Sequence, residues 1–230
     1  MEETVLGWKR IVFESQTTKD RTYRPVLEAA VASAGMGLFG LFVHSGLPWV
    51  PLSGAGLLAT VLAIAHSFRA GGGHAEIFAL LSPSRRVAFY PGLGCAFGAA
   101  FGILFRVYQD VGALPTGLGR VVFAAAAIGA AEEVLFRGYV QGRLRPLGSI
   151  AAVILAAAAH TLYKLALFAL PPEGILINYQ FLAIWTFIGG LIFGGLREFS
   201  DSILPPVSGH VVFDIVVYGQ RVHAPWWVWS

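Results

Sequence analysis

The stretch from Glu132 to Arg137 contains the residue types most suited to chemistry. It places two adjacent carboxylates and a guanidinium at the end of the apolar run 121–129. Ionisable side chains at membrane depth cost roughly 2.5–3.5 kcal/mol each on insertion scales, so they indicate a functional site. On a helix, Glu133 and Arg137 share a face and can form an ion pair, whereas Glu132 is rotated by about 100°. We therefore expect Glu133 and Arg137 to brace the helix end and Glu132 to remain free as a general base. The alternative is a solvated charge cluster at a helix end.

Two later segments offer partners for these carboxylates. His160 lies inside a second apolar run, and Lys164 shares its helical face, where it either reaches outward or pairs with a carboxylate. His210 and Asp214 are also four residues apart in a third apolar segment. Asp214 could orient His210, or both groups could contact a developing oxyanion. The alternatives are a packing histidine at 160 and a structural pair at 210 and 214.

Composition defines the protein class. The 230 residues are 56% hydrophobic and only 13% charged, and the mean hydropathy is +0.68. Soluble domains carry about 25% charged residues, so the sequence predicts an integral membrane protein. The single cysteine, Cys95, excludes an intramolecular disulfide and any multi-cysteine metal site. The basic residues gather in loops, which indicates membrane topology rather than nucleic-acid binding.

The apolar segments predict an all-α, polytopic helix bundle of about seven transmembrane helices, within a range of six to eight. The expected spans are 25–43, 52–68, 87–108, 118–136, 149–170, 181–196 and 207–218. Residues 1–24 form a cytoplasmic or interfacial segment, residues 74–81 an amphipathic piece, and residues 25–230 one membrane-embedded domain. Gly94, Gly98 and Gly102 share one helix face and favour close helix packing.

Lys and Arg residues predict the orientation. With the N-terminus in the cytoplasm, the cytoplasmic segments carry twelve Lys and Arg residues and the opposite segments carry three. This bias predicts a cytoplasmic N-terminus and places the candidate site in the cytoplasmic half of the membrane. Several other protease chemistries lack their motifs, because no His-Glu-x-x-His, Gly-x-Ser-x-Gly or Gly-x-Gly-Asp sequence is present. We therefore expect hydrolysis by an activated water.

These motifs resemble a known family. Glu132-Glu133-x3-Arg137, then His160 late in an apolar helix, then His210-x3-Asp214 resemble the CPBP family of CAAX proteases and bacteriocin-processing enzymes, also called ABI. The family includes the type II CAAX prenyl endopeptidases and is described as glutamic intramembrane proteases. Its second motif is usually Phe-x3-His, and here Ala156 stands at the aromatic position. Its third motif ends in Asn or Asp, and here it ends in Asp214.

The resemblance implies a function and a role for each residue. It implies an intramembrane endopeptidase in which Glu132 and His160 activate a water and His210 and Asp214 stabilise the oxyanion, while Glu133 and Arg137 support the site. It implies no cofactor and no catalytic metal, a membrane-anchored protein or peptide substrate, and residence in the lipid bilayer. The expected location is a bacterial inner membrane. Two other hypotheses stay open: a metal-dependent membrane hydrolase, because Glu, His and Asp are plausible divalent ligands, and a non-catalytic scaffold or transporter on the same fold.

Overall fold

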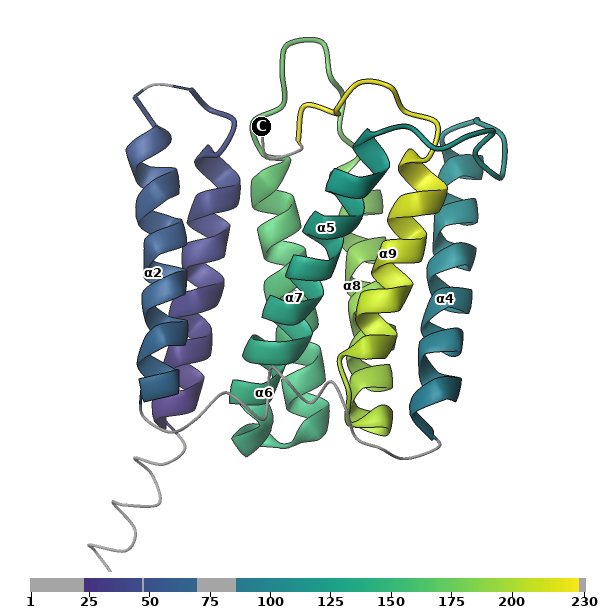
Figure 1. Ribbon diagram of the computed structural model, residues 1–230. Coiled ribbons are helices and arrows are strands. Elements are labelled where there is room, and N and C mark those ends of the chain that lie inside the picture. Colours follow the sequence, from purple (N-terminus) through teal and green to yellow (C-terminus); the bar gives the residue numbers. More distant parts are fainter. Residues whose placement is uncertain (1–22, 47, 70–85, 228–230) are drawn as a thin grey trace, which may run out of the picture.

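The computed structural model describes residues 23–46, 48–69 and 86–227. Most of the predicted segment 1–24 and all of the amphipathic piece 74–81 lie outside the described residues. The described chain is a helix bundle whose helices run roughly parallel or antiparallel to one another (Figure 1). Its secondary structure is helical throughout, which confirms the predicted all-α class.

Five of the described helices are long and apolar enough to cross a membrane. They are the helix Tyr23–Phe42, α2 (Val50–Arg69), α4 (Arg86–Tyr108), α7 (Ser149–Leu167) and α8 (Tyr179–Ser200). A shorter helix, α9 (Leu204–Tyr218), and the helical run that begins with α5 (Val121–Glu133) complete the bundle. This arrangement confirms the prediction of about seven membrane helices.

The fourth predicted span is longer than expected and changes its helical form. It was expected to end at residue 136, but α5 passes directly into a π-helix, η1 (Val134–Val140). The chain then continues through α6 (Gln141–Leu144) and the 3₁₀ turn η2 (Arg145–Leu147). The residues beyond 136 are buried rather than exposed, so the helix continues into the interior of the bundle. Single-turn π-helices inside α-helices are frequent at functional sites.

The three glycines of α4 pack against α9, as their spacing predicted. A side chain at Gly94 would meet the backbone of Pro205, one at Gly98 would meet the backbone of Gly209, and Gly102 faces Val216. A helix pair can come this close only where side chains are absent from the contact. The close contact fixes the position of the helix that carries His210 and Asp214.

The helix Tyr23–Phe42 joins the rest of the bundle through a core of small and aromatic residues. Ala29 and Ala32 of this helix and Ala152 and Ala156 of α7 are almost fully buried in one hydrophobic cluster. Glu28 of this helix forms ion pairs with Arg24 and Arg143. Arg143 lies 115 residues away in the sequence, on the continuation of the fourth span.

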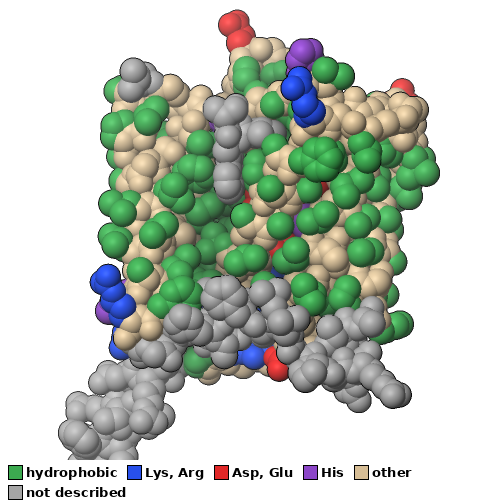
Figure 2. Space-filling model, viewed as in Figure 1, with side chains coloured by type: hydrophobic (Ala, Val, Ile, Leu, Met, Phe, Trp, Pro, Cys, Tyr) green, Lys and Arg blue, Asp and Glu red, His purple; other side chains and the backbone are tan. Residues whose placement is uncertain are grey.

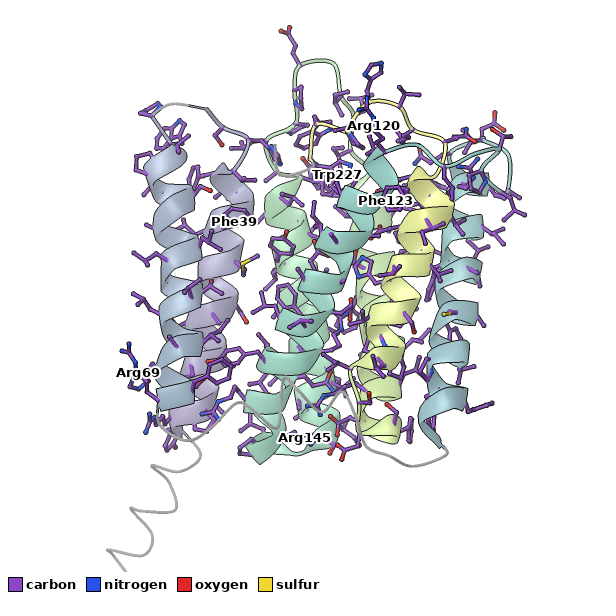
Figure 3. The ribbon with its side chains drawn as sticks, in the orientation of Figure 1. Phe39, Arg69, Arg120, Phe123, Arg145 and Trp227 are labelled. Atoms are coloured by element: carbon purple, nitrogen blue, oxygen red, sulfur yellow. The ribbon has the colours of Figure 1, made fainter. Side chains whose placement is uncertain are left out.

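The outer surface has the distribution of a membrane protein. Large hydrophobic side chains are exposed along the helices, including Leu58, Phe123, Ile150 and Leu162. In Figure 2 they cover the middle of the visible face, while most surface charges lie near the two ends. Figure 3 shows Arg69 and Arg145 at one end and Arg120 at the other. Arg69 and Arg145 therefore lie on the same side of the bundle and Arg120 lies on the opposite side, as the predicted topology requires.

Candidate active site

The three motifs converge on one buried cluster inside the bundle. Glu132 and Glu133 come from the end of α5, Arg137 from η1, His160 from α7, and His210 and Asp214 from α9. Each is at most 8% exposed. The rings of His160 and His210 lie 6.1 Å apart between centroids. Residues separated by about 80 positions in the sequence thus share one site.

Glu132 has two direct partners, both from α7. Its Oε1 accepts a hydrogen bond from Lys164 Nζ at 2.6 Å, and its Oε2 lies 3.2 Å from His160 Nε2. The expectation that Glu132 would remain free is therefore wrong. Lys164 and His160 are one turn apart on α7 and so reach the same carboxylate, which keeps this buried charge compensated.

Arg137 forms the predicted ion pair with Glu133 and has a second contact that the sequence did not predict. Its Nε lies 3.2 Å from Glu133 Oε2, and its Nη1 lies 2.6 Å from His160 Nδ1. A guanidinium can only donate, so Nδ1 of His160 is the acceptor. A neutral imidazole then carries its proton on Nε2 and donates it to Glu132. The hydrogen-bond network thus assigns the tautomer of His160 and the orientation of Glu132 together.

His210 is oriented by Glu133 and faces Glu132. Its Nδ1 donates to Glu133 Oε1 at 2.8 Å. Its Nε2 lies 3.8 Å from Glu132 Oε2 and 3.9 Å from Asp214 Oδ2. Both distances exceed hydrogen-bond length, so Nε2 of His210 lies near the two carboxylates without a hydrogen bond to either. This nitrogen therefore remains able to donate to a bound reactant.

An aromatic side chain from a different helix packs on His160. The ring of Phe136 is fully buried and stacks on the imidazole of His160 with 4.7 Å between centroids and an interplanar angle of 25°. Ala156, at the position where the resembled motif has an aromatic residue, is instead fully buried in the hydrophobic core. Phe136, from η1 rather than from α7, thus supplies an aromatic contact to His160.

Sequence reasoning did not single out Phe136 or Gly129 as site residues. Gly129 lies on α5 one turn before Glu133, and a side chain there would collide with the Asp214 carboxylate and with the ring of His210. The signal for Gly129 was its spacing of four from Glu133, which puts both on the face that meets α9. Phe136 carried no comparable signal, because its direction depends on the π-helical turn of η1.

The carboxylates and imidazoles of the cluster are engaged by other side chains. Within residues 23–46, 48–69 and 86–227, no group of three or more His, Cys, Asp or Glu side chains is arranged to hold a metal ion. Glu132 contacts His160 and Lys164, Glu133 contacts Arg137 and His210, and His160 also contacts Arg137. The donor set is thus that of an ion-pair and hydrogen-bond network.

Comparison with known proteins agrees with this cluster. Residues 113–216 match the sequence model of the family described as type II CAAX prenyl endopeptidase Rce1-like. The matched range includes all six motif residues. Searches of curated proteins and of solved structures found no match. Residues 113–216, a little under half of the chain, are thus similar to the CAAX-protease family that the three motifs resemble, and the apolar helices make the chain an integral membrane protein.

Proposed function

We propose that this chain is a member of the CAAX-protease family and an intramembrane endopeptidase that hydrolyses a peptide bond with a water activated by Glu132. The observation that carries the proposal is the position of the Glu132 carboxylate. It is buried, is contacted by Lys164 and His160, and lies 3.8 Å from Nε2 of His210. A general base needs this combination of fixed geometry and reach toward a reacting oxygen.

In the proposed first step, the water oxygen attacks the carbonyl carbon of the scissile bond and its proton passes to Glu132. His160 does not take this proton, because Arg137 occupies Nδ1 and Nε2 already carries hydrogen. Its role is to hold the Oε2 of Glu132 in place. The base in this proposal is therefore Glu132 alone, with His160 as its direct hydrogen-bond partner.

The same step converts the carbonyl into a tetrahedral oxyanion. We assign its stabilisation to protonated His210, whose Nδ1–H is held by Glu133 and whose Nε2–H faces the site. Asp214 Oδ2 lies 3.9 Å from that nitrogen, on the same face of α9 as His210. Glu132 then returns its proton to the leaving nitrogen, the carbon–nitrogen bond breaks, and a carboxylate and an amine are released.

The setting of the site indicates the class of substrate. The cluster lies within a bundle whose outer surface is apolar, so the substrate is proposed to be a membrane-anchored protein or peptide. The distribution of Lys and Arg supports a cytoplasmic N-terminus and a site toward the cytoplasmic face of a bacterial inner membrane. On this topology, residues 25–230 form the protease domain.

Cleavage by the purified protein in proteoliposomes tests the proposal. The probes are two internally quenched peptides with the same CAAX-type C-terminus, one farnesylated and one not, and mass spectrometry locates the cut. We expect cleavage of the lipid-anchored peptide and loss of cleavage in Glu132→Ala and His160→Ala at unchanged membrane expression. Retained cleavage in Glu132→Ala would contradict the proposed base, and equal cleavage of both peptides would contradict the lipid-anchored substrate.

A further inference from the structure

Lys164 contacts the proposed base and has no assigned role. Its Nζ lies 2.6 Å from Glu132 Oε1, and its side chain is 15% exposed. It lies on α7 one helical turn after His160, so the same helix face supplies a contact to each oxygen of the Glu132 carboxylate. A lysine at membrane depth costs free energy unless it is paired, and here its partner is the group that the proposed reaction requires.

The charges of the cluster depend on this lysine. Each of the two adjacent glutamates has one basic partner: Glu133 pairs with Arg137, and Glu132 pairs with Lys164. Without Lys164 the buried carboxylate that loses its ion pair is therefore Glu132.

Arg137 cannot substitute for Lys164. Its Nε pairs with Glu133 and its Nη1 donates to Nδ1 of His160, so both contacts are directed away from Glu132. His160 donates to Oε2 but is neutral in the tautomer that Arg137 imposes. Within the described residues, Lys164 is thus the lysine or arginine that forms an ion pair with Glu132.

We infer that Lys164 is a positioning residue for the reaction, holding Glu132 ionised and correctly oriented to accept a proton from water. The inference rests on the proposed role of Glu132. The titratable and charged groups that face Glu132 come from α5, η1, α7 and α9. They are Glu133, Arg137, His160, Lys164, His210, Asp214 and Tyr218. Among them, Lys164 is the one whose removal takes positive charge from Glu132 while leaving the contacts of Arg137, His160 and His210 in place.

Infrared difference spectroscopy tests this inference without any substrate. The stretching band of a protonated carboxyl is recorded as a function of pH in wild type, and the band lost in Glu132→Gln identifies Glu132. In Lys164→Met we expect that band to appear at a pH about 1 to 3 units higher than in wild type, because a neighbouring cation favours the charged carboxylate by that amount. Lys164→Arg keeps the charge and should remain close to wild type. An unchanged band in Lys164→Met overturns the inference.

Cleavage of the farnesylated peptide supplies the second readout. In Lys164→Met we expect the acidic limb of the pH profile of kcat to move to higher pH by the same roughly 1 to 3 units as the infrared band. At pH values below the shifted limb, kcat should be at least tenfold lower than in wild type, while KM should change little. Lys164→Gln provides a second neutral variant if Lys164→Met does not fold. A uniform loss at every pH in Met, Gln and Arg variants would indicate a purely structural role and overturn the inference. If Glu132→Gln retained activity while the band still moved, the proposed function would fail and the electrostatic role of Lys164 would stand.

Discussion

Gly129→Ala tests whether the spacing between α5 and α9 sets the catalytic geometry. An added Cβ would overlap Asp214 Oδ2 most closely and would also lie 2.8 Å from Cδ2 of the His210 ring, whereas ordinary contacts begin at 3.4 Å. The Asp214 carboxylate must therefore turn away and the ring must retreat by about 0.6 Å, since side chains in packed interiors have no free volume to absorb the overlap. The bond from the ring to Glu133, at 2.8 Å, would lengthen as the ring retreats.

The expected effect is larger on catalysis than on stability. Overpacking costs about 1–3 kcal/mol, and replacing glycine by alanine in a helix returns roughly 0.5–1 kcal/mol. A misplacement near 1 Å can cost about a hundredfold in rate. We therefore expect kcat to fall at least tenfold in Gly129→Ala, while the unfolding temperature falls by only a few degrees.

The assay compares kcat for the farnesylated peptide and thermal unfolding in the same detergent. Gly37→Ala and Gly189→Ala are matched controls, because both glycines lie in membrane helices and a Cβ at either meets no atom within 4 Å. Both controls should keep wild-type kcat. If Gly129→Ala also stays within twofold of wild type, the geometry assigned to His210 is incorrect.

Three further substitutions probe other parts of the account. Phe136→Leu removes the ring that stacks on His160. We expect the free energy of unfolding to fall by about 0.5–1.5 kcal/mol beyond the change in buried area, and kcat to be lower. A kcat equal to that of wild type would exclude a positioning role for Phe136. In Arg137→Lys, the single ammonium group cannot contact Glu133 and His160 at once, so activity and the unfolding temperature should both fall. Full activity would contradict the tautomer assigned to His160. Gly98→Val should separate α4 from α9 and lower the temperature of thermal unfolding. Gly92→Val is the control, because a Cβ at Gly92 meets no atom within 4 Å. Equal unfolding temperatures for the two variants would contradict the close packing.

Residue type and periodicity were sufficient to predict the helix bundle and the residues of its polar cluster. Apolar runs of about 20 residues predict spans because the bilayer core sets their length. The spacing of four between Glu133 and Arg137, and between His210 and Asp214, predicts shared faces. Three costly polar groups on separate apolar helices then indicate one meeting point, since each is stabilised by the others inside the bundle.

The details that sequence did not predict depend on contacts between distant segments. The fourth span continues to Leu144 through the π-helical η1, and this continuation was missed. That continuation supplies Arg143 to Glu28. Lys164 had two possible directions on its helix face, and only the position of α5 decides that it pairs with Glu132. The stacking of Phe136 on His160 likewise requires the three-dimensional arrangement of η1 and α7.

Replacement of Glu132 by its neutral isostere is the most direct test of the central claim. Glu132→Gln keeps the size of the side chain and removes the proton acceptor, so kcat at saturating farnesylated peptide should fall by about 10²–10⁴-fold. Glu198→Gln is the matched control, because Glu198 lies in α8 and pairs with Arg145 and Arg197 outside the cluster. A kcat for Glu132→Gln equal to that of Glu198→Gln, in protein that is equally folded, would contradict a reaction in which Glu132 activates the water.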